Sequence, residues 1–163
     1  MDKKTQKTMF SSDSSDWETP KDFFERLNRS FRFTLDPCCT PKTTKCPSFF
    51  TKDHDGLSKS WAGHRVFMNP PYGRGIKKWI KKAYEEGSKP QTIVACLIPA
   101  RTDTKYWHEY CMKADEIYFV KGRLKFGDSP NAAPFPSAVV VFRGPPVKNM
   151  PRGDLVVSSM ENK

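Results

Sequence analysis

Apolar residues along the middle of the chain alternate between strand-like runs and helix-like spacing. Short apolar runs predict strands at Arg32–Asp36, Arg65–Met68 and Thr92–Ile98. The third run is apolar without interruption, which is typical of a strand buried on both faces in a parallel sheet. Helices between these runs are indicated by apolar residues three and four apart: Phe23, Phe24, Leu27 and Phe31, then Ile76, Trp79, Ile80 and Ala83, then Tyr106, Trp107 and Tyr110.

The later part of this pattern differs, because three strand-like runs follow one another without a helix between them. They lie at Glu116–Val120, Arg123–Phe126 and Ala138–Phe142, and they predict a C-terminal antiparallel hairpin. Strands that alternate with helices and finish in such a hairpin predict an α/β fold with a mostly parallel, open sheet. Ligands of such sheets bind at the carboxyl ends of the strands.

The same pattern predicts a single domain over residues 17–143. Residues 1–16 are almost entirely polar and predict a mobile leader. Residues 144–163 are interrupted by proline and glycine and predict a flexible tail, in which only Leu155–Val157 is strand-like.

Three absences in the sequence bear on location. The longest apolar run, Ile93–Ile98, is much too short to span a membrane, and the first residues lack the apolar core of a secretory signal. The five cysteines are an odd number without framework spacing, which is typical of reduced thiols. We therefore expect a cytoplasmic protein; the sequence does not indicate an oligomeric state.

Charge adds a partner to this picture. Lysine and arginine number 28 against 18 aspartates and glutamates, which gives a net charge of +10 on 163 residues. A strongly basic small domain favours a polyanionic partner over a merely solubilising surface, because each cation set against a phosphate releases a condensed counterion. Nucleic acid is the expected partner, although charge alone does not distinguish an enzyme from a binding protein.

One tetrapeptide carries candidate chemistry. Asn69, Pro70, Pro71 and Tyr72 directly follow the strand Arg65–Met68. The prolines fix the backbone, so the carbonyls of Asn69 and Pro70 are expected in an extended rim beside the Asn69 carboxamide. Two oxygen acceptors can bind both N–H groups of a planar amine and draw its nitrogen towards a nucleophilic form, while Tyr72 offers a face for stacking. The alternative is an ordinary diproline turn at a strand end.

Several further motifs occur together with this one in a recognisable order. They are Trp17-Glu18-Thr19-Pro20, Leu35-Asp36-Pro37, Asp55-Gly56-Leu57, Asn69-Pro70-Pro71-Tyr72-Gly73, Ile98-Pro99-Ala100-Arg101-Thr102-Asp103 and Gly122-Arg123-Leu124-Lys125-Phe126. Over residues 17–142 the chain resembles the small phage-type (Dam-like) DNA adenine-N6 methyltransferases that use S-adenosylmethionine. This resemblance implies an abbreviated Rossmann-like methyltransferase fold, the tetrapeptide as catalytic residues, double-stranded DNA as substrate and, for a phage-encoded enzyme, the host cytoplasm.

The resemblance also implies which residues bind the cofactor. Thr19 and Pro20 match a segment that contacts the methionine part of S-adenosylmethionine, and Trp17 in the same motif is also expected to bind the cofactor. Asp36 matches the aspartate at the end of the first strand, near the amino-acid end of the cofactor. A further acidic residue is expected to accept hydrogen bonds from the ribose or adenine, and the sequence leaves the choice between two candidates open: Asp53 and Asp55.

The loop after the first strand departs from the usual pattern of this fold. A glycine-rich loop normally follows, whereas here Asp36 is followed by Pro37-Cys38-Cys39-Thr40-Pro41 and the next glycine is Gly56. The sequence therefore leaves open how the cofactor is held. It also contains no sizeable target-recognition domain.

Basic residues near the motifs are the candidates for DNA contact: Arg74, Lys77, Lys78, Arg101 and Arg123. The lysines, together with Lys81 and Lys82, also suit the solvated face of an amphipathic helix, and both interpretations stay open. A zinc site is not expected, because the adjacent Cys38 and Cys39 lack the spacing of metal ligands.

The sequence thus predicts an enzyme that transfers a methyl group from S-adenosylmethionine to N6 of an adenine flipped out of DNA. Two alternatives remain: the same chemistry on an RNA adenine or a protein glutamine amide, and a non-catalytic protein that only binds nucleic acid.

Overall fold

Six strands form one mixed sheet in the computed structural model, which describes residues 17–146. In chain order they are β1 (Leu35–Asp36), β2 (Ser48–Phe49), β3 (Arg65–Met68), β4 (Ile93–Pro99), β5 (Glu116–Phe119) and β6 (Ser137–Arg143). Their order across the sheet is β2-β1-β3-β4-β6-β5. The first four are mutually parallel, and β6 runs antiparallel to both β4 and β5. The predicted α/β class with a mostly parallel sheet is confirmed.

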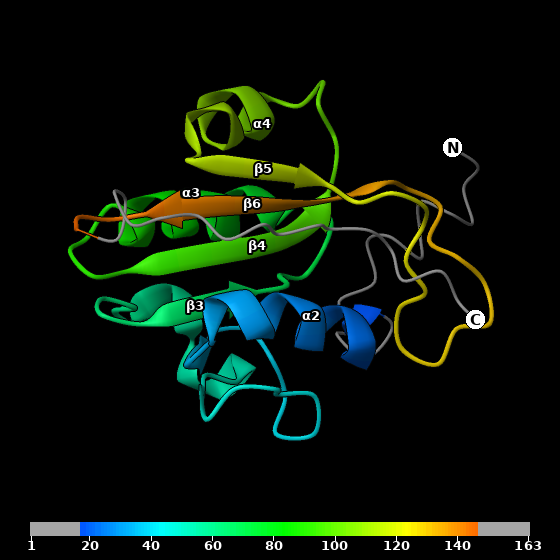
Figure 1. The fold of residues 1–163 in the computed structure, drawn as a ribbon, viewed down its shortest axis with the longest axis horizontal. Helices are drawn as coiled ribbons and strands as arrows, with labels where there is room; N and C mark the ends of the chain where they lie inside the picture. Colours follow the sequence, from blue (N-terminus) through cyan, green and yellow to red (C-terminus); the bar gives the residue numbers. More distant parts are fainter. Residues whose placement is uncertain (1–16, 147–163) are drawn as a thin grey trace.

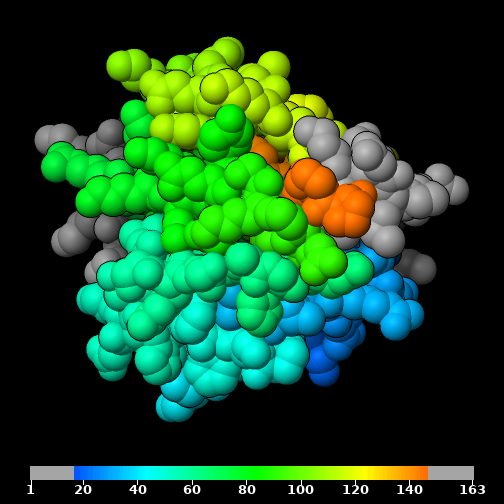
Figure 2. Space-filling view, turned by 90° about the vertical axis from the view of Figure 1, so that its left-hand side faces the viewer, coloured from blue at the N-terminus to red at the C-terminus, as the bar shows by residue number. Residues whose placement is uncertain are grey.

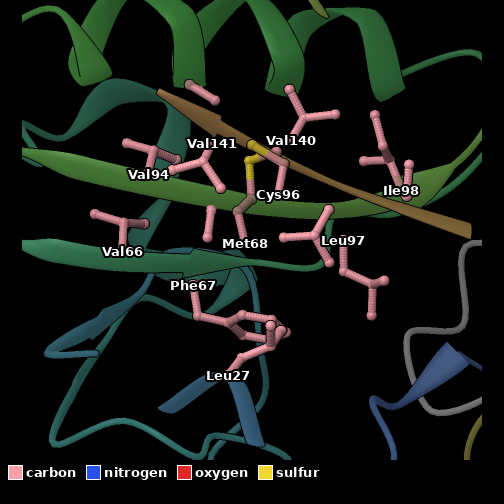
Figure 3. Close-up of a cluster of buried hydrophobic side chains, with 14 of the residues drawn as sticks. Leu27, Val66, Phe67, Met68, Val94, Cys96, Leu97, Ile98, Val140 and Val141 are labelled. Atoms are coloured by element: carbon pink, nitrogen blue, oxygen red, sulfur yellow. The ribbon is translucent and has the colours of Figure 1, made fainter. Parts of the chain in front are cut away.

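Helices cover both faces of the sheet, with α2 (Lys21–Phe31) on one face and α3 (Ile76–Gly87) on the other (Figure 1). The core follows from the alternation of side chains along a strand. Phe67 of β3 points towards Leu27 of α2, whereas the α3 face is lined by residues such as Val140 (Figure 3). All seven residues of β4 are buried, as expected for a central strand between two helical layers.

The remaining elements are short. α4 (Lys105–Glu109) follows β4, and the 3-10 helices η2 (Lys52–His54), η3 (Gly56–Ser58) and η4 (Cys111–Lys113) lie in connections. Figure 2 views the end of the molecule where the parallel strands begin. There the turn from α3 into β4 lies below the α4 region and above the blue-green segment that precedes β3. None of the helices within residues 17–146 is long and apolar enough to cross a bilayer.

The start of α2 differs by one residue from the sequence expectation. The order Thr19-Pro20 in the sequence favours a helix that Thr19 caps and Pro20 begins, because proline suits the first helical position, but α2 begins at Lys21 and Pro20 occupies the cap position with an extended ψ of 132°. The helix then buries four apolar side chains: Phe23, Phe24, Leu27 and Phe31. The Thr19 hydroxyl has another partner, described below, and is therefore not available as a cap.

The C-terminal part of the sheet corrects one expectation and confirms another. Arg123–Phe126 forms no strand; Leu124 and Phe126 are buried alternately, but Leu124 bonds to the Ala133 amide in a loop rather than to a sheet ladder. The predicted C-terminal antiparallel pair is present: β5 and β6 follow one another in the chain and pair antiparallel at the edge of the sheet, with β6 lying between β4 and β5. The expected leader, residues 1–16, and the strand-like run Leu155–Val157 lie outside the described residues.

Candidate active site and cofactor pocket

The Asn69 side chain is held in one orientation at the carboxyl end of β3. Its Nδ2 donates to the carbonyl oxygen of Trp17 at 2.7 Å and to Oγ1 of Thr19 at 2.9 Å. A backbone carbonyl can only accept a hydrogen bond, so the atom that faces Trp17 O must be the amide nitrogen. The segment before α2 thus fixes the direction of the carboxamide.

This orientation leaves the other amide atom without a partner. Asn69 Oδ1 is buried and accepts no hydrogen bond from any described residue. A buried carbonyl-type oxygen without a donor costs about 1–3 kcal/mol, and native structures rarely retain one without reason. Asn69 Oδ1 is therefore a candidate acceptor for an N–H of a ligand.

Tyr72 lies in an aromatic cluster, which we define as Trp17, Tyr72, Phe126 and Phe135. Tyr72 is only 4% exposed, and its ring centroid lies 5.7, 6.1 and 5.5 Å from those of Trp17, Phe126 and Phe135. Its hydroxyl donates to Leu97 O at 3.4 Å. The open stacking face expected from the sequence is thus occupied by the protein's own rings, and a base can reach Tyr72 only if one of them moves.

The loop after β1 contacts the loop that contains Asn69. The Cys38 thiol donates to the carbonyl of Asn69 at 3.4 Å, so this carbonyl is not the open rim expected from the sequence. Burial, with Asp36 and neighbouring thiols, raises the pKa of Cys38 well above its ordinary value, so the group stays a protonated donor. Cys38 was not among the predicted site residues, because no spacing in the sequence indicates this contact.

Asp36 lies behind this loop, at the end of β1. Its carboxylate accepts the amide N–H of Cys38 at 3.2 Å, and it is 7% exposed. Burial raises the pKa of Asp36 to about 6, against the opposing effects of Cys38 N–H, the Cys39 thiol and Lys45. Asp36 therefore stabilises the conformation of this loop through its hydrogen bond to the Cys38 amide.

A pocket of about 530 Å³ opens beside these loops at the carboxyl ends of β1, β2 and β3. Asp53 and Asp55 both line it, together with Pro71 and Trp79. The two candidate cofactor aspartates are thus brought to one cavity next to Pro70-Pro71, which we call the diproline corner. Trp17, Thr19, Pro20 and Asp36, which were also expected to bind the cofactor, are not among the residues that line it.

Gly56 lets two walls of the pocket approach each other closely. A Cβ at this position would lie 2.0 Å from the carbonyl oxygen of Pro37, so only glycine fits. The close backbone approach that a glycine-rich loop after β1 would normally allow is thus permitted from the opposite side, by η3. The motif Asp55-Gly56-Leu57 carried this signal in the sequence, but its role was not recognised.

Trp61 packs beneath the pocket and holds Gly56 in place through a hydrogen bond. It is fully buried, and its Nε1 donates to the Gly56 carbonyl at 2.9 Å, while its own amide N–H donates to Glu86 at 2.8 Å. Its ring stacks at 6.4 Å on Trp79, which lines the pocket. Burial alone would raise the pKa of Glu86, but hydrogen bonds from Lys89, Lys82 and Trp61 outweigh it and hold this pKa below its ordinary value.

The candidate DNA-contacting residues fall into different environments. Arg74 and Lys78 are exposed and form no ion pair with any residue in the described range. Lys77 pairs with Glu109 at 3.3 Å, and Lys82 pairs with Glu86 at 2.9 Å and lies over the Trp61 ring. Lys82 is thus a packing residue rather than part of a solvated face.

Two further candidates lie in loops. Arg123 is exposed and donates to the Ala133 carbonyl at 3.3 Å. Arg101 follows β4 and is half-buried. Residues 17–146 contain no group of three or more metal-ligating side chains, and the five cysteines are all unpaired thiols.

An open, mostly parallel α/β sheet with a cavity at the carboxyl ends of its strands, beside Pro71, is consistent with a methyltransferase-like domain. The particular family is given by sequence comparison: the chain belongs to the DNA N-6-adenine-methyltransferase (Dam) family, whose sequence model matches residues 6–155. This confirms the predicted enzyme class.

A curated relative supports this membership. The DNA N-6-adenine-methyltransferase of Haemophilus phage HP1 (strain HP1c1) is 30% identical to this chain over 119 residues. The similar region covers 71% of this chain and 68% of the relative.

Proposed function

We propose that this chain methylates N6 of adenine in double-stranded DNA with S-adenosylmethionine as methyl donor, on an abbreviated Rossmann-like methyltransferase fold. The observation that carries the proposal is the buried Asn69 Oδ1, which has no donor among the described residues although the amide nitrogen has two acceptors. An amine placed there would supply the missing N–H. The phage origin of the relative favours action in a host cytoplasm.

The pocket suits S-adenosylmethionine in size and in the chemistry of its walls. Its volume of about 530 Å³ lies within the range of roughly 300–1,000 Å³ that small-molecule sites occupy. Asp53 and Asp55 would accept hydrogen bonds from ribose hydroxyls or the adenine amine, and Trp79 and Pro71 provide apolar walls. When bound, the cofactor supplies an electrophilic methyl group on a sulfonium sulfur.

The residues of the diproline corner would orient and activate the adenine amine. Asn69 Oδ1 accepts one N–H, and because the Asn69 carbonyl is occupied by Cys38, the second acceptor is the next carbonyl, that of Pro70. Binding both protons would draw the nitrogen lone pair out of conjugation with the ring and make the nitrogen more nucleophilic. Positioning supplies most of the rate, since the donor is already activated.

The aromatic cluster requires one movement before this chemistry. Stacking of an adenine on Tyr72 displaces Trp17 or Phe135, the two rings whose centroids lie within 5.7 Å of Tyr72. Flipped bases are commonly held between aromatic side chains, so the cluster has the composition such a pocket needs. On the outside, exposed Arg74 and Lys78 are the proposed phosphate contacts, since they form no ion pair within the described range.

The test is methyl transfer from radiolabelled S-adenosylmethionine to DNA, RNA and protein in parallel. We expect label in DNA as N6-methyladenine, and Asn69→Ala should abolish it while calorimetry still detects cofactor binding. The matched control is Asn28→Ala: Asn28 also uses its side chain structurally, accepting the Phe33 amide at 2.8 Å, but at the far end of α2.

Each other outcome has a distinct meaning. Unchanged turnover of Asn69→Ala would remove the mechanism. Label in RNA or protein alone would select another acceptor. No heat on titration of the wild-type chain with S-adenosylmethionine would select a non-catalytic nucleic-acid-binding protein.

A further inference from the structure

We infer that Thr19 is a positioning residue for methyl transfer, which holds the catalytic carboxamide of Asn69 in its productive orientation and does not bind the cofactor. The inference rests on the proposed function of Asn69. It differs from the role that the sequence resemblance gives Thr19, which is contact with the methionine part of the cofactor. The two roles make opposite predictions for a substitution of Thr19: a positioning role predicts a lower kcat, and a cofactor contact predicts a higher cofactor Kd.

The geometry places the Thr19 hydroxyl on Asn69 and away from the pocket. Thr19 is 6% exposed, and its Oγ1 lies 2.9 Å from Asn69 Nδ2. It is not among the residues that line the 530 Å³ cavity. Its hydroxyl also does not cap α2, which has no side-chain cap. The bond to Asn69 is therefore the polar role that the structure assigns to this hydroxyl.

The consequence for Asn69 follows from the two ends of a carboxamide. The amide nitrogen has two N–H donors, and the structure gives each an acceptor: Trp17 O and Thr19 Oγ1. If the amide turned over, its oxygen would face the Trp17 carbonyl, acceptor against acceptor, and the nitrogen would face the substrate. Only the present orientation offers Oδ1 to an amine, and Thr19 supplies one of the two bonds that select it.

The segment that carries Thr19 is itself held by two contacts of the preceding residue, Glu18. The carbonyl of Glu18 accepts the Gly127 amide at 2.9 Å, and the Glu18 carboxylate pairs with Lys45 at 3.0 Å. Both anchors lie in segments distant in sequence from Asn69. The acceptors are thus fixed before substrate binds, as preorganised catalysis requires.

The experiment compares two substitutions of Thr19 with one matched control in the full chain. Thr19→Val keeps the shape of the side chain and removes the acceptor, whereas Thr19→Ser keeps the hydroxyl. The control Thr34→Val removes another partly buried threonine hydroxyl, which bonds His64 at 3.0 Å and the Arg65 amide at 3.0 Å, before β1 at the opposite end of the sheet. Measured quantities are kcat at saturating DNA and S-adenosylmethionine, cofactor Kd by calorimetry, and thermal stability.

We expect Thr19→Val to lower kcat about tenfold, which corresponds to one lost hydrogen bond at the upper end of the usual range, with the cofactor Kd unchanged. Thr19→Ser should restore kcat to within about twofold. Thr34→Val should lose stability without loss of kcat, which separates positioning from a general structural effect.

Two outcomes overturn the inference. A raised cofactor Kd with unchanged kcat in Thr19→Val would make Thr19 a cofactor contact, and unchanged kcat and Kd would leave it without either role. Failure of the proposed function is distinguishable, because the wild-type chain would then not methylate adenine in DNA at all.

Discussion

Replacing Asp36 by asparagine should remove a specific pH dependence of folding stability. The pKa of Asp36 in the folded chain is about 6, against 3.8 for an ordinary aspartate, because the carboxyl is buried. The folded state therefore binds the proton more tightly than the unfolded state. Stability contributed by the protonated form is complete below about pH 4 and is lost as the pH rises to about 6.

The size of this effect follows from the two pKa values. Their difference of about 2.2 pH units, at about 1.36 kcal/mol each, gives about 3 kcal/mol of stability lost between those pH values. Asp36→Asn cannot ionise and keeps an oxygen that can accept the Cys38 amide. Relative to wild type, its free energy of unfolding should therefore rise by about 3 kcal/mol between about pH 4 and pH 7.

Urea unfolding followed by tryptophan fluorescence across this pH range measures the difference directly. Other titrating groups cancel between the two proteins, so the change belongs to Asp36. Substitution of the exposed Asp128 by asparagine is the control for replacing an aspartate outside the core. A stability difference between Asp36→Asn and wild type that stays constant across this pH range would refute the reasoning.

The same variant tests what Asp36 does for the cofactor. If the carboxyl only braces the Cys38 loop, Asp36→Asn should bind S-adenosylmethionine as tightly as wild type, since the acceptor for the Cys38 amide is retained. If instead it contacts the cationic amino group of the cofactor, the loss of charge should weaken binding markedly. Calorimetry with the purified variant separates the two roles.

Four further substitutions test the pocket wall and the basic surface. Gly56→Ala places a Cβ 2.0 Å from the Pro37 carbonyl and should cost about 1–3 kcal/mol of stability and weaken cofactor binding; intact stability and affinity would contradict the close approach. Trp61→Phe leaves the Gly56 carbonyl without its donor and should cost about 1–3 kcal/mol in urea unfolding, and an unchanged midpoint would deny it this support. Lys78→Ala should reduce the slope of log affinity for DNA against log salt concentration by about one, without loss of stability. Lys82→Met, which breaks the pair with Glu86, should lower stability and leave this slope unchanged. Equal effects of the two substitutions would mean that the two lysines share one role.

The fold was predictable where the pattern of side chains was strong. β3 has the predicted bounds, and α3 begins at the first residue of its apolar stripe. β2 was missed because two residues show no period; it is defined by backbone bonds such as Phe50 N to Asp36 O at 2.9 Å. At Arg123–Phe126 the alternation of burial is real, but alternation reports an extended chain over a core and does not say whether a neighbouring strand pairs with it.

The candidate site was predictable as a set of motifs but not as a set of contacts. The sequence singled out Asn69, Thr19 and Trp17, yet nothing in it says that residues about fifty positions apart share hydrogen bonds. Tyr72 illustrates the same limit. Its burial depends on Phe126 and Phe135, which come from the loop before β6, and only the folded chain brings these rings together.

The aromatic cluster has a thermodynamic consequence for nucleotide flipping under the proposed mechanism. Tyr72 is surrounded by aromatic rings in the absence of DNA. A flipped base would therefore replace one aromatic neighbour of Tyr72 and would not enter a water-filled cavity. The apolar contact given up by the departing side chain is largely regained from the purine. The free energy of extrusion is then set chiefly by unpairing within the duplex, and a mismatched adenine should be the easier target.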